Sequence, residues 1–284
     1  MRAWPIIDAG TRAWWRTVGR PVDLNRQHSW LRAPVSAGPR VREGWLADEA
    51  ERLGGTLVRD DPGAGLIPDL AVLDRSGFDA GLLAPQIREF YAHTAAWRME
   101  TWSQWSPPFA APGALISHFF GRRLQQLALP IRSLDVAYGM DSRVVPILDA
   151  GGTQLAAGWL RTLRRTGGVV FSGCYGTRTL PGASGASVHV SFPLEAGNVQ
   201  VFLRPILGPG GSLVLHSGRG RFGQDGAYVV VRHGRGDHAA RVPLHETFHV
   251  FIDDDGVLRT DHELRLFSAR ALRLHYKLLP GSGA

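Results

Sequence analysis

The chain has 284 residues, 44% of them hydrophobic, so it can bury a substantial core in one large domain or two small ones. Its net charge is +7, but Lys277 is the one lysine among 32 basic residues. Arginine in place of lysine, with abundant glycine, alanine and proline, is typical of high-GC bacterial codon usage. The arginines are scattered and are not interleaved with stacking aromatic residues, which argues against nucleic acid as a partner.

The hydropathy pattern favours a cytoplasmic protein. No apolar run approaches the roughly 18 residues of a membrane-spanning helix, and arginines interrupt the stretch Met1 to Arg20 before it could form the apolar core of a signal peptide. The single cysteine, Cys174, excludes an internal disulfide. It lies in a strand-like run and is expected to be a small buried hydrophobic residue.

Residues 1–82 predict an irregular N-terminal arm. The segment is rich in proline, glycine and arginine and is weakly periodic, with one short helix expected over Gly44 to Leu53. We expect this arm to wrap over residues 83–284, which would form a helix pair and an antiparallel β domain in one compact unit.

Two amphipathic helices are predicted next. The first begins at Pro85 and runs to about 105, because apolar side chains recur there at helical spacing: Ile87, Phe90, Tyr91, Thr94, Trp97, Thr101 and Trp105. The second runs from Pro112 to Leu127, with arginines and glutamines on the side opposite its apolar face. Packing against a sheet is the expected role of the pair. Peripheral contact with a membrane surface is the alternative.

From residue 143 onward the period falls to two, and glycine-rich turns separate short apolar runs. Strands are predicted at 143–147, 155–163, 169–175, 187–194, 199–206, 212–217, 227–232, 248–252, 257–267 and 272–278. The absence of intervening helices predicts antiparallel neighbours. The expected fold is α+β: a curved antiparallel sheet or a β-barrel, lipocalin-like or START-like, with the two N-terminal helices packed on it.

The string His245-Glu246-Thr247-Phe248-His249 matches the zinc-protease pattern H-E-x-x-H. That pattern needs a helix, on which the two histidines would share one metal ion and the glutamate would activate water. Here Pro243 precedes the string and Val250-Phe251-Ile252 follows it, which predicts a strand. A zinc hydrolase that uses these residues is therefore a minor alternative, and no metal is expected.

The hairpin that follows can be aligned residue by residue. If Gly256 adopts a left-handed conformation at the end of an aspartate-rich loop, Ile252 faces Leu258. The same register places Phe248 opposite His262 on the apolar side of the sheet, and His249 opposite Asp261 on the other side. His262 is thus predicted to point inward.

The run Gly218 to Gly223 matches G-x-G-x-x-G, but the strand after it indicates a loop, so no dinucleotide cofactor is expected.

These elements predict an apolar pocket between the curved sheet and the helices, which would bind a hydrophobic small molecule or lipid. The expected ligand-binding residues are Phe90, Trp97, Trp105, Trp159, Tyr175 and Arg204. The alternative is an enzyme in the same cavity that performs isomerase-type or cyclase-type acid–base chemistry with His262 and a neighbouring carboxylate; the catalytic candidates are His262, Asp261 and His249.

Overall fold

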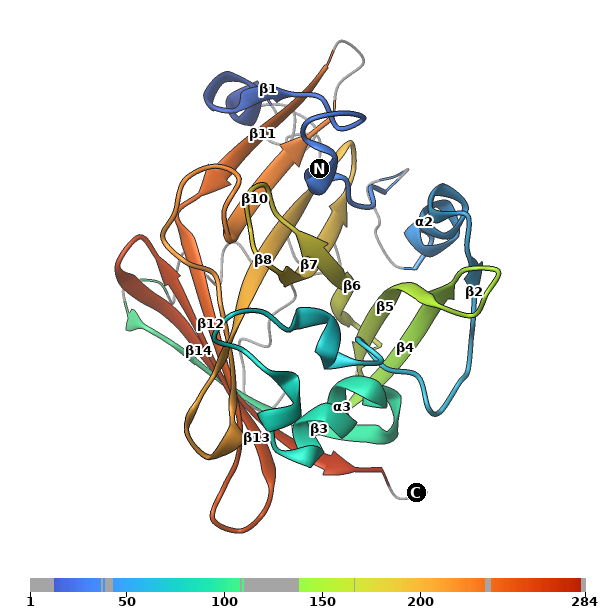
Figure 1. Cartoon of the computed structure of the whole chain (residues 1–284), viewed down its shortest axis with the longest axis vertical. Helices are drawn as coiled ribbons and strands as arrows, with labels where there is room; N and C mark the ends of the chain where they lie inside the picture. Colours follow the sequence, from blue (N-terminus) through green and yellow to red (C-terminus); the bar gives the residue numbers. More distant parts are fainter. Residues whose placement is uncertain are drawn as a thin grey trace.

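The structure, a computed structural model, describes residues 13–36, 38, 43–107, 109, 138–165, 167–232 and 236–281. Antiparallel strands dominate this part of the chain (Figure 1). The strands are β1 (Arg20–Val22), β2 (Thr56–Leu57), β3 (Trp97–Trp105), β4 (Met140–Leu148), β5 (Gln154–Leu163), β6 (Val169–Thr179), β7 (Ala186–Leu194), β8 (Gly197–Leu207), β9 (Leu213–His216), β10 (Gly226–Val231), β11 (Asp237–Val242), β12 (Leu244–Ile252), β13 (Leu258–Leu266) and β14 (Ala269–Pro280).

The helices are few and short. Besides the helical stretch 13–18, the described residues include the α-helices α2 (Trp45–Leu53) and α3 (Pro85–Ala92) and the 3₁₀ turns η1 (Ser29–Leu31), η2 (Leu70–Leu73), η3 (Ala80–Leu82), η4 (Thr94–Ala96) and η6 (Pro209–Gly211). Helix α2 confirms the helix expected over 44–53 and ends at Gly54, whose left-handed φ of 67° is the usual terminator of a helix. None of the helices in the described ranges is long and apolar enough to cross a bilayer.

The strands form one 14-stranded sheet that divides at β8. The first half of β8 pairs with β10, whereas its second half, from Arg204 to Leu207, pairs with β9. One branch continues through β10 and β11 to β1, and the other through β9, β12, β13 and β14 to β3. The long strand β8 therefore belongs to both branches of the sheet.

The sheet is curved, as predicted, but it is not closed. Its path runs from β2 through β4 to β8 and ends at β3 (Figure 1). Strands β3 and β4 approach each other, yet among the described strands β3 pairs with β14 and β4 pairs with β2 and β5, and the two form no ladder together. The β-barrel alternative, and with it a lipocalin-like architecture, is therefore wrong.

The predicted helix from Pro85 to 105 is half right. Helix α3 ends at Ala92, and Trp97 begins strand β3, which pairs along its length with β14. The spacing of Trp97, Thr101 and Trp105 misled the prediction, because residues four apart share a face in a strand as well as in a helix. Without this half of the helix pair, the START-like arrangement is not supported either. The second predicted helix, 112–127, lies outside the described residues.

The strands predicted from residue 143 onward all overlap observed strands, while β11 was not predicted. The hairpin register is also confirmed: Ile252 pairs with Leu258, Phe248 with His262 and His249 with Asp261. Gly256 has the expected left-handed φ, at 75°. The loop Gly218 to Gly223 joins β9 directly to β10, so it does not open a helix. Both strands are antiparallel to β8.

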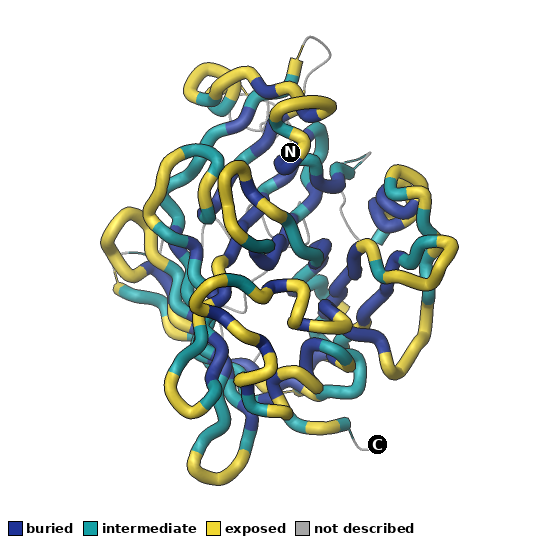
Figure 2. The backbone as a smooth tube through the Cα atoms, in the orientation of Figure 1, coloured by how far each residue is buried: buried dark blue, intermediate teal, exposed yellow. Residues whose placement is uncertain are grey.

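The largest core lies on the concave, inner face of the sheet, where the chain from Ala64 to Tyr91 covers the strands (Figures 1 and 2). Leu66, Leu73 and Ile87 from this covering segment are buried against strand residues such as Val201. Residues on both sides of position 82 thus share one core. The start of the covering segment passes close to the end of α3. An added Cβ on Gly65 would lie 2.0 Å from the carbonyl oxygen of Ala92, so only glycine fits there.

The outer face is covered by other parts of the N-terminal segment. Helix α2 packs Trp45 and Leu46 against β4, β5 and β6, and Gly158 makes room for Leu46. The chain from Val22 to Leu31 packs on β8 and β10. Both faces of the central strands are therefore buried, as the dark segments in Figure 2 show.

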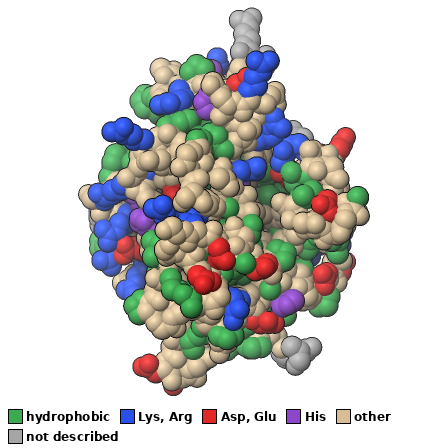
Figure 3. All heavy atoms as spheres, in the orientation of Figure 1, with side chains coloured by type: hydrophobic (Ala, Val, Ile, Leu, Met, Phe, Trp, Pro, Cys, Tyr) green, Lys and Arg blue, Asp and Glu red, His purple; other side chains and the backbone are tan. Residues whose placement is uncertain are grey.

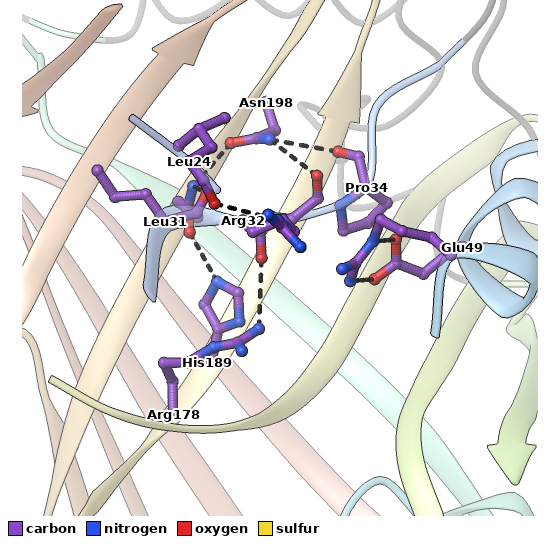
Figure 4. A network of polar contacts seen from close by, with 11 residues as sticks. Leu24, Leu31, Arg32, Pro34, Glu49, Arg178, His189 and Asn198 are labelled. Atoms are coloured by element: carbon purple, nitrogen blue, oxygen red, sulfur yellow. Dashed lines mark hydrogen bonds and ion pairs between the residues drawn. The ribbon is translucent and has the colours of Figure 1, made fainter. Parts of the chain in front are cut away.

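A network of hydrogen bonds fastens this N-terminal segment to the sheet (Figure 4). His189 Nε2 lies 2.8 Å from Gln200 Oε1, and Gln200 Nε2 donates to the Leu31 carbonyl at 2.8 Å. Asn198 Nδ2 donates to the carbonyls of Ala33 and Pro34. The side-chain amides of β8 thus donate hydrogen bonds to backbone carbonyls of the N-terminal segment.

Charge is distributed unevenly over the face shown in Figure 3. Carboxylates gather over its lower half, where the segment that covers the inner face lies, and lysine and arginine gather above them and along the left margin. The net positive charge is therefore not concentrated over the covering segment.

Candidate functional site: an apolar cavity inside the curved sheet

A cavity of about 260 Å³ lies between the inner face of the sheet and the covering segment. Strands β5 to β8 contribute to its wall, together with α3 and with β12, β13, β14 and β3 of one branch. The residues that line it are Leu66, Phe90, Tyr91, Met99, Trp159, Arg161, Val170, Phe171, Tyr175, Val190, Phe192, Val199, Val201, Leu203, Leu244, Glu246, Phe248, Val250, Thr260, His262, Leu264, Leu272, Leu274, Tyr276 and Leu278. The size is close to the lower end of the range of small-molecule pockets, about 300–1,000 Å³.

Strand alternation decides which side chains reach the cavity. Along β12, Glu246, Phe248 and Val250 line it, whereas His245 and Thr247 line a separate surface hollow on the other face. Successive side chains of a strand point to opposite faces, so this division follows directly from the sequence order.

Aromatic rings form one end of the wall. The ring of Trp159 lies 5.2 Å from that of Phe171 and 5.5 Å from that of Tyr175, centroid to centroid. Its indole nitrogen donates to Ser142 Oγ at 2.8 Å. The polar atom of Trp159 is therefore satisfied away from the cavity, and its ring is left as apolar wall.

Arg161 is the cationic side chain of this wall and is only 5% exposed. Its Nη2 lies 3.2 Å from Thr101 Oγ1 and 3.5 Å from Met140 Sδ. Its guanidinium carbon lies 5.3 Å from the centroid of Trp159 and 5.6 Å from that of Tyr276. Nε is buried without a hydrogen-bond partner, and no described carboxylate forms an ion pair with this side chain. Burial lowers the pKa of Arg161, but a guanidinium stays protonated in proteins.

The cavity tyrosines remain neutral phenols. Burial raises the pKa of Tyr91, of Tyr175 and of Tyr276 above the usual value for tyrosine. The nearby positive charge of Arg161 opposes this shift at Tyr175 and Tyr276 without cancelling it. Their hydroxyl groups can therefore donate hydrogen bonds within the cavity.

His262 and Glu246 form a second polar group in the wall. His262 Nε2 lies 3.1 Å from Glu246 Oε2, and the imidazole stacks on Phe248 with the centroids 3.8 Å apart. The other ring nitrogen, Nδ1, is buried and has no hydrogen-bond partner among the described residues. A carboxylate that binds one imidazole nitrogen while the other is free is an arrangement that can take up and release a proton.

The structure separates the predicted ligand-binding residues into two groups. Phe90, Trp159 and Tyr175 line the cavity. Trp97 packs against the ring of Phe90 from outside the lining, and Trp105 is half-buried near the end of β3 without reaching the lining. Arg204 is exposed, because it alternates with the cavity residue Leu203 on β8 and points to the outer face.

Of the catalytic candidates, only His262 reaches the cavity. Asp261 lies on the opposite face of β13 and accepts a hydrogen bond from His275 Nδ1 at 2.8 Å. His249 is aligned with Asp261 in the ladder, but its ring stacks on Phe251. The carboxylate beside His262 is Glu246, not Asp261.

The zinc alternative fails on secondary structure. His245 and His249 both lie in strand β12, so they are separated by about 13 Å of extended chain, which is too far for one metal ion. Within the described residues, no group of three or more histidine, cysteine or carboxylate side chains could hold a metal ion.

Cys174 is buried on the outer side under α2, and burial raises the pKa of its thiol.

Sequence reasoning missed Arg161 and Glu246 as cavity residues. The signal for Glu246 was present, because the register that turns Phe248 inward also turns Glu246 inward. The signal for Arg161 was weaker: both Trp159 and its neighbour Leu160 are buried, and alternation cannot assign a face where both faces are apolar.

In comparisons with known proteins, no family model, no curated protein and no solved structure matches this chain.

Proposed function

We propose that this protein binds a hydrophobic small molecule or lipid in the cavity inside its curved sheet. The observation that carries the proposal is the cavity itself, about 260 Å³ with a wall of mostly apolar side chains. Natural ligand pockets combine such a wall with a small number of polar groups that fix orientation. Arg161, Glu246 and His262 are polar groups of this kind here.

The space inside the sheet supports the proposal energetically. A protein interior packs as densely as an organic crystal, and an empty apolar space forfeits contacts on all its walls. A ligand that fills the space restores those contacts, and it stabilises the folded state in proportion to the logarithm of its concentration over its dissociation constant.

Binding can be tested with N-phenyl-1-naphthylamine, a neutral apolar dye whose fluorescence rises when it leaves water. The wild-type protein should bind the dye and unfold at a higher temperature in its presence. Native mass spectrometry and organic extraction of freshly purified protein would show whether a natural ligand already occupies the cavity.

A matched pair of variants separates the cavity from the surface. Val201→Phe places a phenyl ring inside the cavity, since Val201 is buried in its wall. Ile206→Phe makes the same change on the same strand at a position that is 42% exposed. Val201→Phe should weaken dye binding about tenfold or more, while Ile206→Phe should leave it unchanged. Equal binding by all three proteins would contradict the proposal.

A second candidate function is favoured by the pair formed by His262 and Glu246. An imidazole with one free nitrogen can take a proton from a carbon atom next to a carbonyl, while the carboxylate stabilises the resulting imidazolium. Return of the proton at another position of the ligand isomerises it, with no net gain or loss of protons. The cavity could therefore host an isomerase, the alternative expected from the sequence.

Proton exchange provides the test of this second function. The bicyclic ketone 2-tetralone exchanges its acidic C–H hydrogens with deuterated water, and mass spectrometry measures the rate. The wild-type protein should accelerate the exchange, and His262→Gln should abolish the acceleration. His275→Gln is the matched control, because His275 and Asp261 form a similar pair at the surface. Acceleration that survives His262→Gln would exclude this mechanism.

A further inference from the structure

Arg161 holds a positive charge inside the cavity that the described chain does not neutralise. Its side chain is 5% exposed, its Nε has no hydrogen-bond partner, and its Nη2 contacts the neutral groups of Thr101 and Met140. The carboxylate in the same wall, Glu246, is hydrogen-bonded to His262. Burial lowers the pKa of Arg161, and the groups that oppose this shift are the tyrosines at positions 276 and 175, not a carboxylate.

A buried charge without a counter-ion is costly. Proteins that retain a buried arginine almost always pair it with a carboxylate or phosphate, because desolvation of an isolated ion costs several kcal/mol. Arginine cannot escape this cost by losing its proton. The missing negative charge should therefore come from outside the described chain, and the cavity that Arg161 lines is the place where a ligand can supply it.

The surroundings of Arg161 define the chemistry of that ligand. The guanidinium lies near the rings of Trp159 and Tyr276, and the neutral phenols of Tyr175 and Tyr276 offer hydroxyl donors beside it. These donors suit an acceptor with two oxygens in one plane, which a carboxylate provides. The rest of the wall is mostly apolar, so a small inorganic anion would leave most of the cavity without contacts.

We propose that the ligand of this cavity is an apolar molecule that carries one carboxylate, and that Arg161 binds the carboxylate. The inference rests on the proposed function of the cavity and adds its ligand class.

The test compares decanoic acid with decanol, which have the same chain and differ only in the head group. Their dissociation constants are measured at pH 8 by competition with N-phenyl-1-naphthylamine. The acid should bind the wild-type protein about 10- to 100-fold more tightly than the alcohol, as expected for a hydrogen bond to a charged group. Arg161→Met should reduce this ratio to within about 2-fold, while Arg161→Lys should retain part of it.

Two sets of control variants show whether the preference for the acid belongs to Arg161. Arg204→Met removes an exposed arginine of the outer face and should leave the ratio unchanged. The side-chain carboxylates outside the described residues are Asp8 and Asp135, and the double variant Asp8→Asn/Asp135→Asn should also leave it unchanged. A rise of about tenfold or more in the affinity of the double variant for decanoic acid would show that the chain itself supplies the counter-ion, and would overturn the inference.

The inference and the proposed function fail in different ways. If the dye and decanol bind but the acid binds no better than the alcohol, the cavity is a ligand site and the role of Arg161 is refuted. If the dye, the alcohol and the acid all fail to bind, the proposed function is wrong and the inference fails with it. The lysine variant keeps the test decisive even if the methionine variant does not fold.

Discussion

The hydrogen-bond network behind β7 and β8 and the polar groups of the cavity differ in how their side chains are paired. Behind β7 and β8, the ring of His189 contacts Gln200, and the amide of Gln200 donates to a carbonyl of the N-terminal segment. In the cavity, Arg161 Nε and His262 Nδ1 are buried without partners among the described residues. Buried polar groups in native proteins are nearly always hydrogen-bonded, so an exception calls for a specific cause.

On the outer face, the polar groups bind the backbone of residues 31–34 and hold it in place (Figure 4). On the inner face, the covering segment contributes mainly apolar side chains, such as Phe90 and Leu66. The amides of Gln200 and Asn198 are thus paired by the chain, although Arg178 Nε on the same face is not, and Arg161 Nε and His262 Nδ1 have no partner among the described residues.

The largest effect is expected on the outer face, where packing gives stability. Trp45→Ala should lower the free energy of unfolding by about 4 kcal/mol, because Trp45 is fully buried between α2 and the sheet. Urea unfolding followed by circular dichroism measures the loss. Trp102→Ala is the matched control at an exposed position of β3 and should cost less than about 1 kcal/mol. Similar losses in the two variants would refute the packing assigned to α2.

The next prediction breaks the polar network of Figure 4. Gln200→Leu removes the partner of the His189 ring and of the Leu31 carbonyl, and each buried group left unsatisfied costs about 1–3 kcal/mol. The free energy of unfolding should fall by about 3 kcal/mol, while N-phenyl-1-naphthylamine binding to the folded protein is retained. Gln104→Leu, on the exposed side of β3, should change the stability by less than about 0.5 kcal/mol. Loss of dye binding in the Gln200 variant would show that the two faces are coupled.

A third prediction concerns pH. Burial lowers the pKa of His189 to about 3, so this residue is neutral in the folded state but takes up a proton in the unfolded state below about pH 6.5. Its contribution to stability is complete above pH 6.5 and falls as the pH decreases toward 3, by about 2 kcal/mol between pH 7 and pH 5. Unfolding measured over this interval should show the decline, and His189→Gln should flatten it. An equal decline in both proteins would assign the pH dependence to other groups.

The sequence predicted the strands better than the helices for a physical reason. Glycine-rich turns and period-two runs are local signals, and they identified the hairpin of β12 and β13 down to its register. The stretch from Trp97 to Trp105 failed because its aromatic residues are spaced by four, which satisfies both periods; its pairing with β14, distant in sequence, decides the outcome. Strand β11, with the sequence Asp-His-Ala-Ala-Arg-Val, has few of the β-branched and aromatic residues that mark a strand.

The sequence predicted an apolar pocket inside the curved sheet but identified only some of the residues that line it. Phe90 and His262 could be assigned from local periodicity. Arg204 could not be distinguished from Arg161 in this way, since each lies in a strand whose sequence is mostly apolar at the positions of both faces. Only the covering segment determines which face becomes a cavity and which becomes a packed layer, and that depends on contacts between residues far apart in the chain.

The smallest expected effect on stability belongs to Arg161, and it separates the two faces most sharply. If the arginine were a structural partner, like Gln200, Arg161→Met would destabilise the protein by about 3 kcal/mol or more, because it would leave another charge or polar group unpaired. If it awaits a ligand, methionine replaces an uncompensated charge with an apolar side chain of similar length. The free energy of unfolding without ligand should then stay the same or rise by about 1 kcal/mol. The stabilisation that decanoic acid gives the wild-type protein should be lost at the same time. A variant that gains intrinsic stability while losing its response to the acid would show that Arg161 is retained for binding and not for folding.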